Sequence, residues 1–86
     1  MNFYSELERI TKIQPNRSAI FWDGGSLSYM DFCNMASSIG SALSKTFNLK
    51  KGEHVALVME NDCLFLPILF GIWKAGLTAV PINSKL

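Results

Sequence analysis

The sequence predicts a small α/β domain that contains a β-hairpin and a parallel strand-helix-strand unit. Three observations lead to this class. Two short β-prone segments flank a pair of glycines, an unbroken apolar run follows a polar loop, and a later helical pattern ends at a glycine before another β-prone segment. With 86 residues, the chain has room for one small domain.

The composition restricts the classes of function. Hydrophobic residues form 49% of the chain and charged residues 17%, a balance that argues against disorder. The 8 basic and 7 acidic residues give a net charge of +1, and the basic residues are spread along the chain. Because proteins that bind DNA or RNA gather positive charge on one surface, we expect no nucleic-acid partner.

The first predicted helix covers the N-terminal region. Asn2 is suited to cap it, because a short polar side chain can accept a hydrogen bond from the first free amides. The pair Gln14-Pro15 ends it, since proline disfavours helical angles in the residue before it. The apolar residues of this helix form one stripe, which we expect to be buried: Phe3, Leu7, Ile10 and Ile13.

A β-hairpin follows, with strands at residues 18–22 and 26–29 around the turn Asp23-Gly24-Gly25. Ser28 and Asp31 have the spacing of a capping box and begin a second, long helix. The apolar stripe of that helix consists of Tyr29, Phe32, Ala36, Ile39 and Leu43. A group of serines on the same helix indicates close packing or a hydrated face rather than a phosphate site: Ser37, Ser38, Ser41 and Ser44.

The second half predicts strands at residues 55–59 and 77–82, parallel to each other in one sheet. The first of them is apolar throughout, which is typical of parallel strands between two covering layers. We therefore expect both strands to be buried on both faces. The connection between them is expected to be a right-handed crossover.

A third helix is predicted at residues 63–75, between these two strands. Asn61-Asp62 is suited to cap it, and Gly76 is suited to end it in a left-handed backbone conformation. Pro67 lies near the fifth position, where proline removes a helical hydrogen bond. We therefore expect a kink or a later helix start.

One segment comes close to a nucleotide-binding motif. Residues 71–78 nearly match the phosphate loop GxxxxGK[ST], but Leu77 replaces the lysine that contacts phosphate. A phosphate loop also follows a strand and opens a helix, whereas this segment closes a helix and opens a strand. We therefore predict no nucleotide site here.

Residues suited to metal binding or catalysis are too few to form a site. Cys33, Cys63 and His54 do not supply a zinc site, and no nucleophile motif or pair of acids occurs, so we predict no metal-binding and no catalytic residue in this chain. Both cysteines are interpreted as reduced, buried thiols. With no signal-peptide pattern at the N-terminus, they predict a cytoplasmic protein. The apolar run at residues 63–73 is too short to span a bilayer, so no transmembrane segment is expected.

Several short segments are informative through their order and spacing. They are Ser28-Tyr29 with Asp31 and Phe32, Lys51-Gly52-Glu53 before Val55-Ala56-Leu57, Asn61, and Lys74-Ala75-Gly76 followed by Val80-Pro81-Ile82-Asn83. In this order they resemble the opening of AMP-forming acyl-CoA synthetases, within the adenylate-forming ligase superfamily. The resemblance covers essentially the whole chain and is closest to the fatty-acid and related carboxylate-activating members.

The resemblance implies the chemistry of that family. ATP activates a carboxylate substrate, here expected to be a fatty acid, to an acyl adenylate with release of pyrophosphate, and the coenzyme A thiol then forms the thioester. ATP, Mg²⁺ and coenzyme A are thus implied for the complete enzyme. The family's phosphate loop, its ribose-binding acid and the lysine of its mobile C-terminal domain follow the region seen here.

Residues 1–86 are therefore expected to form a partial N-terminal AMP-binding domain, cut before the phosphate loop, that is inactive alone and binds none of these cofactors. By the same resemblance, Lys85 stands where many relatives carry an arginine. We expect it to contact a phosphate of coenzyme A in the complete enzyme.

Two other interpretations fit parts of the sequence. A stand-alone interaction module derived from the ligase opening would bind a partner through an exposed apolar sheet, and a small nucleotide-binding α/β domain would need a glycine-rich loop after a strand. Because 86 residues leave little chain to cover the apolar strands, we expect association with the remainder of a parent ligase, or self-association through open sheet edges.

Overall fold

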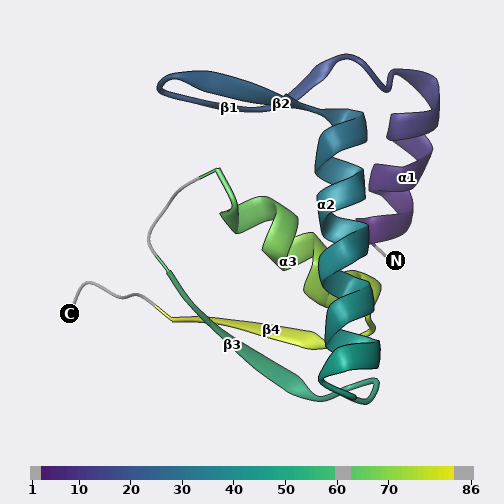
Figure 1. Cartoon of the computed structure of the whole chain (residues 1–86), viewed down its shortest axis with the longest axis vertical. Coiled ribbons are helices and arrows are strands. Elements are labelled where there is room, and N and C mark those ends of the chain that lie inside the picture. The colour runs from purple at the N-terminus through teal and green to yellow at the C-terminus, as the bar shows by residue number, and fades with distance from the viewer. Residues whose placement is uncertain (1–2, 60–62, 83–86) are drawn as a thin grey trace.

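The computed structural model describes residues 3–59 and 63–82 and confirms the predicted α/β class (Figure 1). The elements in chain order are helix α1 (Phe3–Ile13), strands β1 (Ser18–Trp22) and β2 (Gly25–Ser28), helix α2 (Tyr29–Ser41), the π-helical segment η1 (Ala42–Thr46), strand β3 (His54–Val58), helix α3 (Phe65–Lys74) and strand β4 (Thr78–Ile82).

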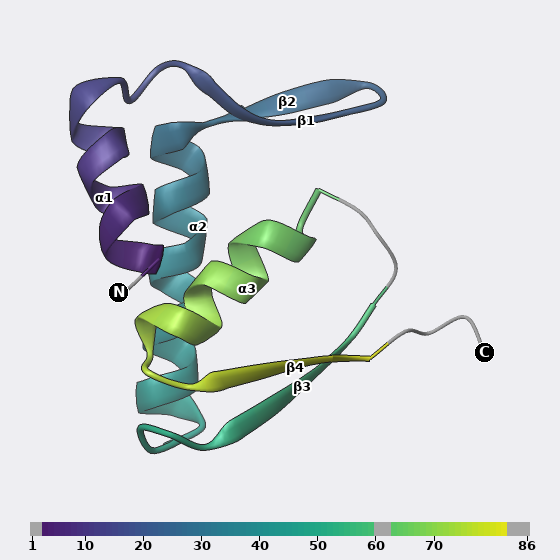
Figure 2. The same cartoon turned by 180° about the vertical axis from the view of Figure 1, so that it is seen from behind.

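Helix α2 runs along the long axis of the molecule and contacts both other α-helices (Figures 1 and 2). Helix α1 packs beside it, and α3 crosses it obliquely. The β1–β2 hairpin projects at the end where α2 begins, and the β3–β4 sheet lies under α3 near the end where α2 stops. Helix α2 therefore holds the two sheets apart.

The hairpin forms as predicted, with its second strand one residue earlier than expected. Trp22 pairs with Gly25, which leaves Asp23 and Gly24 as the two turn residues. Gly24 has φ +101°, a backbone angle that favours glycine. The predicted cap is also confirmed, because Ser28 Oγ accepts a hydrogen bond of 3.1 Å from the amide of Asp31 at the start of α2.

Helix α1 has the predicted bounds but buries a different face. Tyr4 and Leu7 are its buried residues, whereas Phe3 and Ile13 of the predicted stripe are 53% and 68% exposed. The predicted stripe is therefore wrong at both ends. The cause is a tertiary contact, because burial of Tyr4 against α2 sets which face of α1 points inward. The ring of Phe3 then lies at the edge of the interface, with its centre 4.9 Å from the centre of the Trp73 ring. The predicted cap, Asn2, lies outside the described residues.

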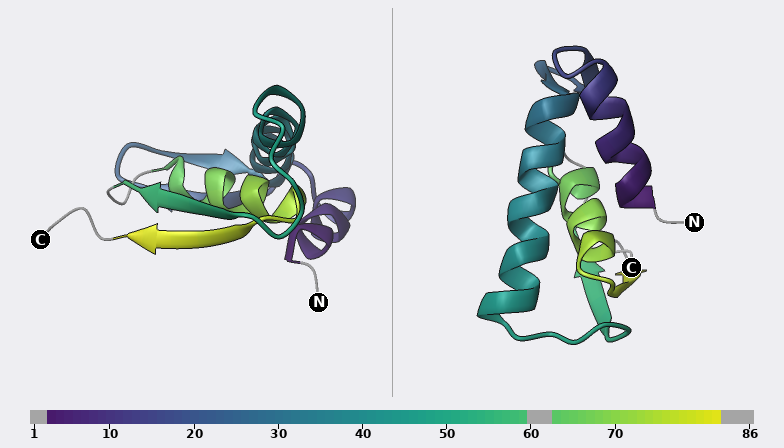
Figure 3. Two further views of the ribbon diagram at one scale, coloured as in Figure 1. Left: turned by 90° about the horizontal axis from the view of Figure 1, so that it is seen from below. Right: turned by 90° about the vertical axis from the view of Figure 1, so that its right-hand side faces the viewer.

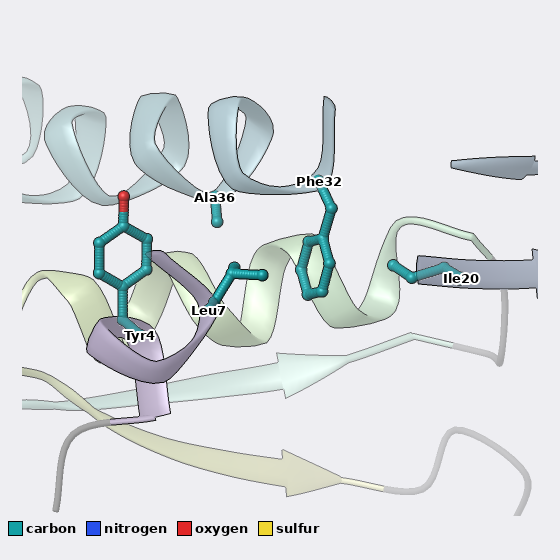
Figure 4. Packing of buried hydrophobic residues seen from close by; sticks show 5 residues of the cluster. All are labelled: Tyr4, Leu7, Ile20, Phe32 and Ala36. Atoms are coloured by element: carbon teal, nitrogen blue, oxygen red, sulfur yellow. The ribbon is translucent and has the colours of Figure 1, made fainter. Parts of the chain in front are cut away.

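The apolar core is divided into two clusters. The first contains Tyr4, Leu7, Ile20, Phe32 and Ala36, from α1, β1 and α2 (Figure 4). The second, around the β3–β4 sheet, contains Leu57, Ile72 and Leu77. Helix α3 belongs to both, because its Phe70 packs on the first cluster while Ile72 is in the second.

Helices α2 and α3 approach each other closely at two glycines. A Cβ atom added to Gly40 would lie 2.9 Å from the carbonyl oxygen of Gly71. One added to Gly71 would lie 2.6 Å from Ile39 Cγ2 and 3.0 Å from the carbonyl oxygen of Ala36. Both glycines are buried. Any larger side chain at either position would force the helices apart.

The β3–β4 pair is parallel, as predicted, with His54 opposite Thr78 and Val58 opposite Ile82. Gly76 ends the turn after α3 with φ +76°, which confirms its predicted role. Its carbonyl oxygen accepts a hydrogen bond of 2.8 Å from the amide of Gly52. The sheet is therefore fixed to the loop before β3 by backbone hydrogen bonds.

The prediction that both strands are covered on both faces is wrong for this chain. Leu57 is buried, but Val58, Val80 and Ile82 are 59%, 38% and 45% exposed. The reason is geometric: α3 packs on one face of the two-stranded sheet, and no second helix of the described residues covers the other face (Figure 3). Self-association through this sheet stays a prediction.

Helix α3 begins later than residue 63, in agreement with one of the two outcomes expected from Pro67. It starts at Phe65, which places Pro67 in the first turn, where a missing amide costs little. The predicted cap, Asn61-Asp62, lies outside the described residues. The structure places Leu64 at the cap position.

Replacing Ser28 with alanine is expected to lower the free energy of unfolding by about 1 kcal/mol, because the Asp31 amide loses its acceptor. Urea unfolding followed by circular dichroism measures this. Ser38→Ala, on an exposed position of the same helix, is the matched control and should change stability by less than about 0.5 kcal/mol. Equal effects of the two substitutions would contradict the capping role.

Candidate functional site

The main polar cluster of the described residues lies where the three helices meet. Lys74, at the end of α3, donates from Nζ to the hydroxyl of Ser37 at 2.7 Å, to the carbonyl oxygen of Ser37 at 3.2 Å and to the hydroxyl of Ser41 at 3.4 Å. The same Nζ lies 5.8 Å from the centre of the Tyr4 ring, within reach of a cation–π contact. We call Lys74, Ser37, Ser41 and Tyr4 the Lys74 junction.

Tyr4 connects this junction to the first apolar cluster. Its side chain leaves α1 with the hydroxyl pointing toward α2 (Figure 4), and the hydroxyl oxygen lies 3.8 Å from Cys33 Sγ. Burial raises the pKa of the Tyr4 phenol above its ordinary value; a hydrogen bond with Ser37 opposes this effect, and the Cys33 thiol adds to it. Tyr4 is thus held in its neutral form.

The Lys74 junction stabilises the packing of the helices. The Lys74 ammonium donates to neutral oxygens, and none of the ion pairs among the described residues involves it. Its hydrogen bonds connect α3 to α2, and the Tyr4 ring connects it to α1. The junction therefore fixes α3 on α2.

This junction is not predicted by the sequence patterns described above. In the sequence, Lys74 belongs to a segment that resembles the family, and the serines indicate only close packing or a hydrated face. The available signal was the spacing of Ser37 and Ser41, four residues apart with Gly40 beside them, because such a spacing places two hydroxyls and a gap on one helix face.

The segment that resembles a phosphate loop is structural. Residues 71–78 span the end of α3, the Gly76 turn and the first residue of β4, as predicted. Gly71 faces Ile39 and Ala36 of α2, so its backbone cannot approach a phosphate. No three acids, cysteines or histidines among residues 3–59 and 63–82 come together as metal ligands. Residues 71–78 therefore do not have the strand-then-helix order of a phosphate loop.

The remaining candidates are placed as follows. Lys85 lies outside the described residues. His54 is exposed at the start of β3. Cys33 and Cys63 are free thiols, but both are half-buried rather than buried as predicted, because Cys33 sits at the margin of the first cluster and Cys63 precedes α3. Within the described part of the chain, no helix is both long and apolar enough to cross a membrane.

Comparison with known proteins settles the family. Residues 7–86 match the sequence profile of the AMP-binding family, described as "AMP-binding enzyme". The chain belongs to this AMP-binding family. The match covers both sheets and all buried residues of the two clusters except Tyr4, so the family assignment does not depend on one motif.

Relatives of this chain include proteins that are named for long-chain fatty acids. The chain is 34% identical over 76 residues to long-chain fatty acid transport protein 6 of Mus musculus. This alignment covers 88% of the chain and 12% of the transport protein. The chain is also 32% identical over 76 residues to the long-chain-fatty-acid–CoA ligase of Haemophilus influenzae. This alignment covers 88% of the chain and 14% of the ligase.

The fold is shared with a solved member of the family. The fatty acyl CoA synthetase of Mycobacterium tuberculosis superposes with a TM-score of 0.90 at 28% identity, over 99% of this chain and 17% of that structure. The resemblance to the N-terminal segment of AMP-forming acyl-CoA synthetases is therefore confirmed. The chain spans only 12% to 17% of the length of these three proteins.

Replacing Tyr4 with phenylalanine should reduce the loss of stability at high pH. The Tyr4 pKa is raised in the folded state, so its contribution is complete below the unfolded value of about 10 and is lost as the pH rises through the folded value. Urea unfolding at about pH 8 and about pH 11 should show a smaller decrease for Tyr4→Phe than for the wild-type chain. Equal decreases would show that Tyr4 does not titrate differently in the two states.

Proposed function

We propose that this chain is part of an AMP-forming carboxylate:CoA ligase that acts on fatty acids. Such an enzyme consumes ATP to form an acyl adenylate and pyrophosphate, and then transfers the acyl group to the thiol of coenzyme A. The observation that carries the proposal is the family match over residues 7–86, supported by relatives named as a long-chain-fatty-acid–CoA ligase and a fatty acyl CoA synthetase.

Within this ligase, residues 1–86 are proposed to be the first part of the AMP-binding domain and to act as a structural frame. The two parallel strands end at Val58 and Ile82, on the same side of the sheet. In α/β proteins, ligands bind beyond the carboxyl ends of such strands. Contacts with ATP, Mg²⁺ and the acyl group would come from later segments that pack against this edge.

Two smaller parts of the proposal concern coenzyme A and the compartment. Lys85 follows β4 in sequence and is proposed to contact a phosphate of coenzyme A, as a compact charge without the two-pronged geometry of arginine. The thiols of Cys33 and Cys63 are both free, which supports a reducing compartment such as the cytoplasm.

The product of the complete reading frame is expected to exchange labelled pyrophosphate into ATP when a long-chain fatty acid is present, and to form the acyl-CoA thioester when coenzyme A is added. Residues 1–86 alone are expected to give no exchange above a heat-killed control, because the segment at residues 71–78 is not a phosphate loop. An aromatic carboxylate serves as the matched substrate control.

Three results would contradict the proposal. Exchange by residues 1–86 alone would show that a nucleotide site exists in this chain. No exchange by the complete product with any carboxylate would remove the ligase assignment. Exchange with the aromatic acid but not with the fatty acid would keep a ligase and remove the fatty-acid specificity.

A further inference from the structure

The end of the molecule where α2 stops combines an exposed aromatic ring with a local excess of positive charge. Residues 42–53, which we call the basic end, comprise η1 and the loop that leads to β3. This segment lies at the opposite end of the long axis from the β1–β2 hairpin (Figure 1). It contains three of the 8 basic residues of the chain, Lys45, Lys50 and Lys51, and one acid, Glu53.

The charge of the molecule is therefore unevenly distributed. The basic end has a net charge of +2, whereas the whole chain has only +1. The three lysines are exposed, and the acid is engaged locally, because a Glu53 carboxylate oxygen accepts from the backbone amide of Lys50. An approaching surface thus meets ammonium groups.

Phe47 is the exposed aromatic ring of this end. It is 67% exposed, whereas its apolar neighbours Leu43 and Leu49 pack against the second cluster. The backbone is fixed on both sides of it: the Phe47 amide donates to Ala42 at 3.1 Å, and the Leu49 amide donates to Leu43 at 3.1 Å. Phe47 is therefore held outward by the ordered chain around it.

The residue between Phe47 and Leu49 allows one side chain to point outward and the other inward. Asn48 has φ +54°, a left-handed conformation that asparagine tolerates better than most residues. The reversal at Asn48 turns Leu49 inward after Phe47. The side chain of Asn48 also accepts a hydrogen bond of 3.0 Å from Lys50 Nζ, so one of the lysines is oriented beside the turn.

We propose that the basic end docks on an anionic phospholipid surface, with Phe47 inserted among the acyl chains and Lys45, Lys50 and Lys51 near the headgroups. An exposed ring in a segment that carries three exposed lysines is a combination that binds such surfaces, because apolar insertion and attraction to anionic lipids add. A soluble acidic partner would satisfy the lysines but would give no reason to expose the ring. This inference does not depend on ligase activity.

The test is co-sedimentation of the protein, expressed from its complete reading frame, with vesicles of phosphatidylcholine alone or of equal parts phosphatidylcholine and phosphatidylserine. Pelleting without vesicles is subtracted, so self-association does not count as binding. Binding is expected to the anionic vesicles only and to weaken with added salt. Replacing each lysine by glutamine should weaken it about fivefold, and replacing all three about a hundredfold.

Two phenylalanine variants separate the proposed site from general stickiness. Phe47→Ser should weaken binding about tenfold. Phe21→Ser is the matched control, because Phe21 is 74% exposed in β1 of the hairpin, at the opposite end of the molecule. Equal binding to neutral vesicles, equal loss for both variants, or retention of a soluble acidic peptide instead of vesicles would each overturn the proposal. Circular dichroism of each variant shows that the fold is kept.

Discussion

The close contact between helices α2 and α3 at Gly40 and Gly71 sets the arrangement of the rest of the molecule. Because neither residue has a side chain, the two helices approach until the backbone of one lies against side-chain and carbonyl atoms of the other. Lys74 lies three residues after Gly71. Because the two helices are close at this point, its side chain reaches Ser37 and Ser41. The same crossing places Phe70 in the first cluster and Ile72 in the second. One contact thus joins two clusters that would each be too small alone.

This architecture explains how the chain carries the fold of its family. Its conserved geometry relative to solved ligases, with a TM-score of 0.90, comes from helix crossing, turns and strand pairing. Among residues 3–59 and 63–82, no three acids, cysteines or histidines come together as metal ligands. The exposed face of the β3–β4 sheet agrees with a frame on which further segments of a ligase would pack.

Features that depend on a few neighbouring residues could be predicted from the sequence. The Ser28 cap, the Gly76 turn and the parallel strand pair follow from local chemistry, and each is present. The buried face of α1 could not be predicted, since Tyr4 and Phe3 are both apolar and adjacent, and only the contact of Tyr4 with α2 decides between them. Whether one or both faces of the β3–β4 sheet are buried also depends on how many helices pack on it. The apolar pattern of a strand does not give that number.

In the candidate site, too, features set by neighbouring residues could be predicted and features set by tertiary contacts could not. The rejection of residues 71–78 as a phosphate loop required only the order of helix and strand. That order is present, and the absence of a nucleotide site stays a prediction. The Lys74 junction could not be predicted, because a lysine that donates to neutral oxygens on another helix leaves no charge pairing in the sequence. Gly40 was missed for a related reason: a glycine inside a helix looks unfavourable until its partner helix is known.

A double-mutant cycle at the helix crossing tests this account most directly. In an open helix, Gly→Ala stabilises by up to about 1 kcal/mol. At Gly71 the added Cβ would meet Ile39, so Gly71→Ala is expected to destabilise the chain by about 1–3 kcal/mol in urea unfolding. Its effect should be smaller in an Ile39→Ala background, where the nearest methyl group is gone. A stabilising Gly71→Ala, or the same cost in both backgrounds, would contradict the account.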